Sequence, residues 1–170
     1  MFCREEALDF LSLFSTESMK GFTPFAVIKE TIPTKQCADD DCLGVGAFAR
    51  DYFTAAKENM IIDRKLTWYN ALGNRKLYQQ SLTTWNPFTF VSNLKETKAR
   101  GTAKGVTDSN LKGEGLTQGG IIVFNKEGGV EFLYKEKTGF EIPKEEIVAA
   151  CMNVKSKFES KKANDLVQQE

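Results

Sequence analysis

The segment 119–135 constrains the fold most, because it predicts two strands joined by a tight turn. An apolar run over 119–125 is separated by Gly128-Gly129 from a second run over 130–135. A glycine pair between two such runs is typical of an antiparallel β-hairpin. A helix should follow over 143–152, because Pro143 suits a first helical turn and Cys151 lies on the apolar side of that segment. The second half of the chain therefore ends in a ββα unit.

Upstream of the hairpin, helical and strand patterns alternate. Apolar residues at three- and four-residue spacing predict the helices, and short apolar runs rich in strand formers predict the strands. The expected order is helix 4–15, strand 23–29, helix 45–56, strand 60–63, helix 65–72, and then an irregular helix with a long surface excursion over 74–115. Gly73 suits a helix C-cap.

This order predicts a thioredoxin-like α/β sandwich. We expect strands 23–29, 60–63, 119–125 and 130–135 to lie in one sheet, with the helices that begin at Arg4 and at Pro143 packed against it. Such a sheet has a central strand directly before its first helix, whereas this sequence opens on the helix. We therefore expect an N-terminally truncated thioredoxin-like domain over 1–154 and a polar, frayed tail over 155–170.

Composition excludes several function classes. The 170 residues include 23 Lys and Arg, 23 Asp and Glu, and no histidine. Zero net charge provides no broad field to attract nucleic acid, and the lack of histidine excludes Ser-His-Asp and Cys-His catalysis and imidazole metal ligation. No apolar stretch of the ~18 residues needed to cross a bilayer occurs, and no signal peptide is recognisable. We expect a cytoplasmic protein with neither metal nor cofactor, whose four cysteines are thiols.

Cys3 is the main candidate for chemistry. It lies at the amino end of the first predicted helix, where unpaired amides and the helix dipole favour a thiolate, and Arg4 adds a positive neighbour. The alternative, an incidental cysteine near a frayed terminus, remains open. Cys37 and Cys42 enclose three aspartates that raise thiol pKa values, which favours a solvated acidic loop over a redox pair. Cys151 is expected in the core.

Four segments together resemble the peroxiredoxin-like 2 family, a group of AhpC/TSA-type thioredoxin-like proteins whose selenium-containing members are called selenoprotein U. The resemblance rests on residues 2–7 (FCREEA), 25–30 (FAVIKE), 113–124 (GEGLTQGGIIVF) and 134–140 (YKEKTGF), and it extends to about Met152. A single one of these motifs would be weak, but four in the same order are specific.

The resemblance implies a C-x-x-C redox motif at the first helix and antioxidant, peroxiredoxin-like reductase activity. Cys3 corresponds to the second, resolving cysteine, and the first chalcogen would stand just before Met1, as cysteine or as selenocysteine. Where thioredoxin has a cis-proline facing the redox pair, this chain has Gln118, Gly119 and Gly120. Arg4 and these three residues are therefore the expected neighbours of Cys3.

The leading hypothesis is a thiol-dependent redox enzyme that acts on a peroxide or disulfide and is reduced by a thiol donor of the thioredoxin or glutathione type. The chain as given would be impaired, because it lacks the attacking residue. The rival hypothesis is a thioredoxin-fold protein without turnover that binds a partner or regulates by its thiol state. A modest basic stretch, Lys95 to Lys104, is expected to be a solvated loop rather than a nucleic-acid surface.

Overall fold

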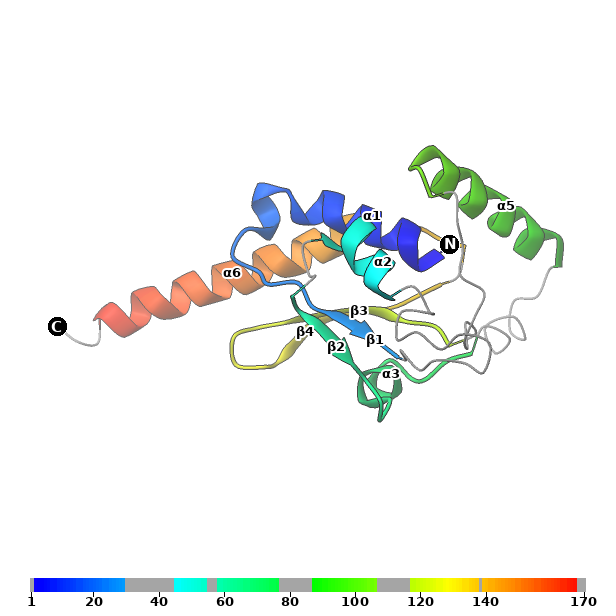
Figure 1. Cartoon of the computed structure of the whole chain (residues 1–170). Helices are drawn as coiled ribbons and strands as arrows, with labels where there is room; N and C mark the ends of the chain where they lie inside the picture. The colour runs from blue at the N-terminus through cyan, green and yellow to red at the C-terminus, as the bar shows by residue number, and fades with distance from the viewer. Residues whose placement is uncertain are drawn as a thin grey trace.

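A computed structural model describes residues 2–29, 45–54, 58–76, 87–106, 117–137 and 139–167. Figure 1 shows the arrangement of the helices and strands. In chain order they are α1 (Phe2–Phe14), the 3-10 helix η1 (Glu17–Met19), β1 (Ala26–Ile28), α2 (Val45–Asp51), β2 (Met60–Ile62), α3 (Thr67–Ala71), α5 (Pro87–Ala103), β3 (Gly120–Phe124), β4 (Val130–Lys135) and α6 (Lys144–Val167). Among these residues, no helix combines the length and the apolar character needed to cross a membrane.

The strands form two separate pairs. β1 pairs with β2 in parallel, with Val27 opposite Ile61, and β3 pairs with β4 in antiparallel fashion, with Ile122 opposite Leu133. Each pair is a sheet of its own in the described part of the chain. The predicted hairpin is confirmed, but the expectation of one four-stranded sheet is wrong. Apolar runs predict that strands exist, but they do not show which strand lies beside which.

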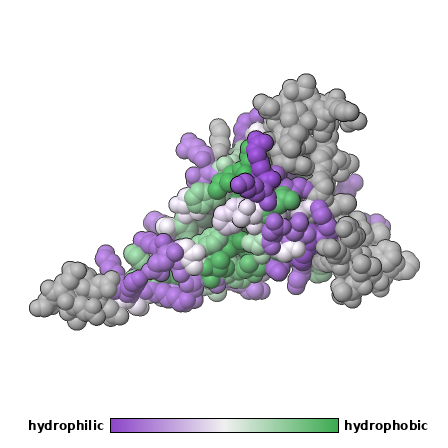
Figure 2. Space-filling view, turned by 90° about the horizontal axis from the view of Figure 1, so that it is seen from below, coloured by the Kyte–Doolittle hydropathy of each residue, from purple (hydrophilic) through white to green (hydrophobic). Residues whose placement is uncertain are grey.

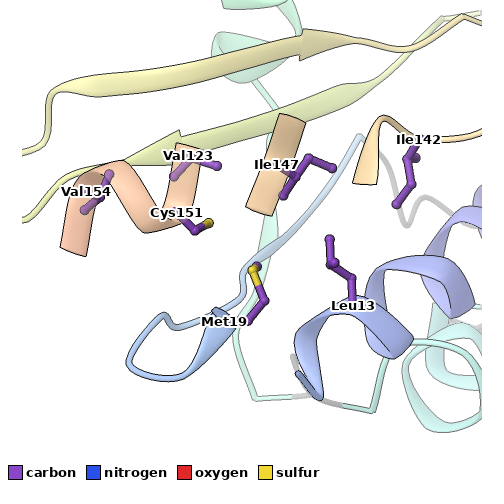
Figure 3. Close-up of a cluster of buried hydrophobic side chains, with 7 residues drawn as sticks. All are labelled: Leu13, Met19, Val123, Ile142, Ile147, Cys151 and Val154. Carbon is purple, nitrogen blue, oxygen red and sulfur yellow. The ribbon is translucent and has the colours of Figure 1, made fainter. Parts of the chain in front are cut away.

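The main core lies where α1, η1, β3 and α6 meet. Figure 3 shows seven buried side chains from these elements and from the segment before α6, with Cys151 on the α6 side and Leu13 and Met19 opposite it. Ile147 and Cys151 are almost fully buried. Both helices that were predicted to cover the strands therefore do so, and the prediction that Cys151 belongs to the core is confirmed.

A second, smaller core holds the N-terminal half of α1 against the other strand pair. Ala7, Ala26 and Phe53 are buried together. Phe10 of α1 stacks on Phe53, with 5.7 Å between ring centroids, and Phe53 stacks on Phe48 of α2 at 6.0 Å. Because stacked aromatic side chains bury large areas, these contacts tie α2 and β1 to α1.

Helix α3 begins shortly after Asp63 and ends shortly before Gly73, and both residues explain its limits. The Asp63 carboxylate accepts hydrogen bonds from the amides of Thr67 and Trp68, both at 2.7 Å, and so satisfies two of the unpaired donors of the first turn. Gly73 follows the helix with φ of +93°, as expected of a C-cap glycine. Trp68 packs edge-on against Phe124 of β3, at 5.6 Å between ring centroids. Helix α3 therefore links the two strand pairs on the side away from α1 (Figure 1).

Helix α6 is longer than the sequence pattern indicated. The prediction ended it at Met152, whereas it continues to Val167. The segment beyond Met152 contains neither glycine nor proline to stop a helix. Two lysines of this extension, Lys157 and Lys161, form ion pairs with Glu131 and Glu127 of the hairpin, both at 2.6 Å. The fraying of the tail and the domain boundary at 154 stay predictions.

Candidate functional site

The first turn of α1 contains Cys3, as predicted. The helix starts at Phe2, so the backbone of Cys3 belongs to the turn whose amides have no partner within the helix. The side chain of Cys3 lies outside the described part of the structure. The helix start is therefore established here, whereas the chemistry of the thiol stays a prediction.

Arg4 is placed differently from what the sequence suggested. Its side chain is buried, and its guanidinium lies 5.1 Å from the centre of the Tyr52 ring, just after α2. A cation over an aromatic face is attracted by the ring quadrupole. Arg4 therefore anchors the start of α1 to the segment after α2, in addition to any effect of its charge on Cys3.

The segment Gln118, Gly119 and Gly120 leads into β3, and neighbouring atoms lie close to its backbone. Gln118 is buried, and its backbone N–H donates to the backbone carbonyl of Arg75 at 2.9 Å. A Cβ on Gly120 would lie 2.2 Å from the carbonyl oxygen of Tyr134 and 2.8 Å from a methyl of Leu72. At Gly120 it is therefore β4 and Leu72 that approach the backbone closely, and the expected position of these glycines beside Cys3 stays a prediction.

A cavity of about 1250 Å³ brings most of the predicted site together. It reaches from the N-terminal half of α1 between the two strand pairs to α6, and its walls include Arg4, Gly119 and Gly120. Gln118 is buried directly before that wall. Glu6 and Glu136, neither of which the sequence analysis assigned to the site, line the same cavity. In the space-filling view from below, hydrophobic atoms gather at the centre of the face and hydrophilic ones border them (Figure 2).

Glu6 and Glu136 form a partly buried carboxyl pair in this wall. Burial, together with the negative charges of Glu136, Glu5 and Asp9, raises the pKa of Glu6 to about 8. Burial also raises the pKa of Glu136, although a hydrogen bond from the Gly119 amide to its Oε2, at 2.7 Å, works in the opposite direction. Two carboxyl groups in one poorly solvated wall resist simultaneous ionisation. The pair therefore retains a proton near neutral pH.

The sequence carried a signal for this pair that the analysis did not use. In the first turn of α1, an acid such as Glu6 suits the positive end of the helix dipole, which gives no indication of a site. Yet Glu6 belongs to the motif 2–7 and Glu136 to the motif 134–140, and Gly119 between them belongs to the motif 113–124. Three of the four segments that carry the family resemblance thus meet at one wall of the cavity.

The other two acids of α1, Glu5 and Asp9, form ion pairs with basic side chains of other segments. Glu5 accepts from Arg100 at 2.8 Å and lies 3.2 Å from Lys104, and Asp9 lies 2.8 Å from Lys104 and from Lys144. Burial opposes ionisation of Asp9, but the hydrogen bonds from the two lysines outweigh it and lower the pKa.

These ion pairs correct the interpretation of the basic stretch. Arg100 and Lys104 had been placed on a solvated loop, whereas Arg100 lies on α5 and Lys104 directly follows it. Positive charges in a sequence do not reveal which buried acids they face. The contact fixes α5 beside α1, the helix that carries Cys3.

The remaining cysteines do not join this site in the described structure. Cys151 is buried in the main core, and burial raises the pKa of its thiol. Cys37 and Cys42 lie outside the described residues. In the described parts of the chain, no three acidic or thiol side chains converge on a point that could hold a metal ion.

Comparison with known proteins assigns the family. Residues 9–138 match the family described as AhpC/TSA antioxidant enzyme. This match begins after Cys3, so it supports the family without assigning that residue a role. No curated protein and no solved structure matches the chain. Because the match spans more than half of the chain, the protein belongs to the AhpC/TSA antioxidant enzyme family.

Proposed function

We propose that this protein is a thiol-dependent oxidoreductase of the peroxiredoxin-like 2 type, in which Cys3 is the resolving cysteine. The AhpC/TSA family indicates thiol-dependent redox or antioxidant chemistry in general. The single observation that carries the finer proposal is the position of Cys3 in the first turn of α1, the helix whose Arg4 and Glu6 line the cavity. A helix N-terminus stabilises a thiolate through its unpaired amides.

The proposed cycle uses two chalcogens. The first, as thiolate or selenolate, attacks a hydroperoxide oxygen, becomes a sulfenic or selenenic acid, and releases an alcohol or water. The Cys3 thiolate then attacks that sulfur or selenium, an intramolecular bond forms, and hydroxide leaves and takes up a proton as water. An external dithiol of the thioredoxin type, or two molecules of glutathione, reduces the bond and restores both groups by thiol exchange.

The substrate and the location follow from the same proposal. A peroxide or a disulfide would serve as the oxidant, and we place the protein in the cytoplasm, where a thiol reductant is available. No further cofactor is needed for this cycle, since each electron pair passes between chalcogens.

We also propose that the complete fold contains one more strand, which lies between β1 and β3. The amide of Ala26 and the carbonyl of Ile28 bind Asn59 and Asp63 on the β2 side, so the backbone groups of Val27 point away from β2. The Val27 carbonyl meets only the Tyr69 hydroxyl, at 3.5 Å, among the described residues.

The facing edge of β3 is open in the same way. The carbonyl of Gly119 accepts from the Glu136 amide on the β4 side, and the alternation of an antiparallel pair then directs the backbone groups of Ile122 away from β4. Both free edges border the same cavity, and both of its faces are covered. Phe10 of α1 lines one side, and Trp68 and Tyr69 of α3 line the other.

The occupant that fits this slot is an apolar strand of about five residues that leads directly into α1. A strand, α1 and β1 would together form a parallel βαβ unit, the usual right-handed connection. Because both faces of the slot are covered by helices, the strand should be apolar on both sides. The same segment would end with the first chalcogen, one residue before Met1.

The transcript upstream of the Met1 codon tests the missing strand. We expect an in-frame segment that encodes a run of β-branched and aromatic residues, followed directly before Met1 by a cysteine codon or by UGA. UGA supports selenocysteine, and a cysteine codon supports an ordinary redox pair. An upstream frame that encodes no strand would overturn the proposal.

Peroxide consumption tests the redox function. The chain with its natural upstream segment should consume hydroperoxide in the presence of a thioredoxin or glutathione reducing system, and Cys3→Ala should lose this turnover. Cys151→Ala is the matched control, because it removes a thiol from the core and leaves the first turn of α1 unchanged. Equal, negligible rates in the unchanged protein and in Cys3→Ala would favour a thioredoxin-fold protein that binds or regulates without turnover.

A further inference from the structure

We propose that the chain as given binds an extended apolar segment of another polypeptide, which adds to it as a β-strand between β1 and β3. This inference rests on the proposed missing strand and deepens it, since it states that the slot accepts a strand that is not covalently joined to α1. Recognition by strand addition uses backbone hydrogen bonds for affinity and side-chain pockets for specificity. The walls of the slot provide both.

The two facing strand edges provide the backbone groups. On β1, Val27 directs its N–H and C=O away from β2, and on β3 Ile122 and Gly120 direct theirs away from β4. Lys29, just after β1, contacts Thr117, just before β3, at 3.4 Å, so the two edges run in opposite directions. An inserted strand therefore pairs in parallel with one edge and in antiparallel fashion with the other.

The two faces of the slot select apolar side chains. Ala7 and Phe10 of α1 line one side of the cavity, and Trp68, Tyr69 and Leu72 line the other, where α3 lies (Figure 1). Side chains that alternate along an inserted strand would be covered by one helix or the other. A charged side chain at a central position would lose its water without gaining a partner, which costs several kcal/mol. The preferred segment is therefore apolar on both faces.

The size of the cavity favours a peptide over a small molecule. Its volume is about 1250 Å³, whereas pockets for small ligands measure about 300–1,000 Å³. Strand β3 presents the five residues Gly120–Phe124 along the slot, and a segment of that length spans about 17 Å when extended. We therefore expect a segment of about five residues, rich in valine and isoleucine.

A synthetic peptide tests the inference on the chain as given. The probe is KVIVIVK with blocked ends, in which the apolar residues fill the slot and the terminal lysines maintain solubility. It is used at concentrations at which it remains monomeric, and calorimetry measures its Kd. A peptide concentration about 100 times the Kd should raise Tm by about 5–10 °C, because only the folded chain binds it.

N-methylated peptides separate strand pairing from simple apolar binding. The backbone N–H groups of successive residues in an extended peptide point to opposite edges. Methylation of the central valine nitrogen, or of the adjacent isoleucine nitrogen, removes a donor to one edge or to the other and adds apolar surface. Each change should weaken binding at least about tenfold, since a carbonyl of the slot loses its partner. A peptide that merely fills an apolar cavity should bind at least as well after methylation.

Matched proline substitutions test the protein side. Ile122→Pro removes an N–H that faces the slot. Ile62→Pro removes one on the outer edge of β2, because Asn59 and Asp63 bind β1 and the alternation turns Ile62 away from it. Peptide affinity should fall at least about tenfold in Ile122→Pro and stay unchanged in Ile62→Pro. Near-ultraviolet circular dichroism verifies folding, and if Ile122→Pro fails to fold, the N-methylated peptides on the unchanged protein decide.

The outcomes separate this inference from the proposed function. Binding that N-methylation abolishes, and that is lost when the natural upstream segment fills the slot, supports strand addition. Absence of binding, binding that tolerates N-methylation, or equal binding with and without the upstream segment overturns it. The redox function is tested independently by hydroperoxide consumption, and the missing strand by the transcript, so either can stand or fail without this inference.

Discussion

The contact between α1 and α5 includes the buried acid Glu5, and removing its partner Arg100 should destabilise the protein measurably. The Glu5 side chain is 4% exposed and receives Arg100 at 2.8 Å and Lys104 at 3.2 Å. Arg100→Met keeps the length of the side chain but removes this bond and the one from Arg100 to the carbonyl of Gly139, at 3.2 Å. Lys104 still neutralises Glu5, so the loss is that of hydrogen bonds to a charged group rather than of the whole pairing.

We expect Arg100→Met to lower the free energy of unfolding by about 1.5–3 kcal/mol. For a chain of this size, that corresponds to a decrease in Tm of about 3–12 °C. Urea denaturation followed by tryptophan fluorescence measures both the midpoint and the slope. In Arg100→Met/Glu5→Gln, the second substitution should cost less than it does alone, because the two side chains interact.

Lys20→Met is the matched control for this prediction. Lys20 pairs with Glu17 at 3.1 Å, but the two side chains are 75% and 84% exposed. Exposed pairs contribute between zero and about 1 kcal/mol, so this change should be near neutral. Equal destabilisation by Arg100→Met and Lys20→Met would refute the argument that burial gives the Glu5 contact its strength.

Three further predictions concern the cavity and its walls. Gly120→Ala should lower the free energy of unfolding by about 1–3 kcal/mol, because the new Cβ would lie 2.2 Å from the Tyr134 carbonyl oxygen. Gly119→Ala should cost less, since its Cβ would lie 3.4 Å from the carboxylate of Glu136, which can move. Equal urea midpoints for the two variants would contradict this. The folded-state pKa of Glu6, about 8, lies above the ordinary 4.5, so the unfolded chain loses this proton first and stability should fall by up to a few kcal/mol between pH 4.5 and 8. Glu6→Gln should remove that fall, matching the unchanged protein at pH 4 and exceeding it at pH 9 in thermal unfolding, and parallel curves would count against a raised pKa. Finally, the chain as given should bind the dye ANS, because the slot leaves apolar surface and strand edges open. The chain with its natural upstream segment should lose that dye binding, and undiminished binding would argue against a strand in the slot.

Local features of the fold were predictable from the sequence. The hairpin β3–β4 follows from two apolar runs and a glycine pair, and the start of α6 follows from Pro143 and the acids after it. Helix α1 follows from its apolar spacing. Each of these signals lies within a window of about fifteen residues, where periodicity and turn chemistry act directly.

The pairing of the strands was not predictable in the same way. Nothing in the residues of β1 or β3 states which strand lies beside them, and the single expected sheet separates into two pairs. The end of α6 was also placed too early, because its last turns are held by ion pairs with Glu127 and Glu131, more than twenty residues away.

The candidate site was predictable only in part. Cys3, Gly119 and Gly120 were identified from helix position and family resemblance. Arg4 was expected beside Cys3, and in the structure its guanidinium lies over the Tyr52 ring. Glu6 and Glu136 are 130 residues apart in the sequence, and only the fold brings them to one wall. A glutamate in a first helical turn has the same pattern whether it is solvated or buried, so its pKa depends on what packs against it.

The relative reactivity of Cys3 and Cys151 tests the central claim most directly. At pH 6, iodoacetamide should label Cys3 in the folded protein at least about tenfold faster than Cys151, because a helix N-terminus favours the thiolate whereas burial raises the pKa of Cys151. The tryptic peptides 1–4 and 145–155 report the two thiols in a single experiment. Labelling of Cys3 at the same rate as Cys151, or more slowly, would contradict the assignment of Cys3 as a redox thiol.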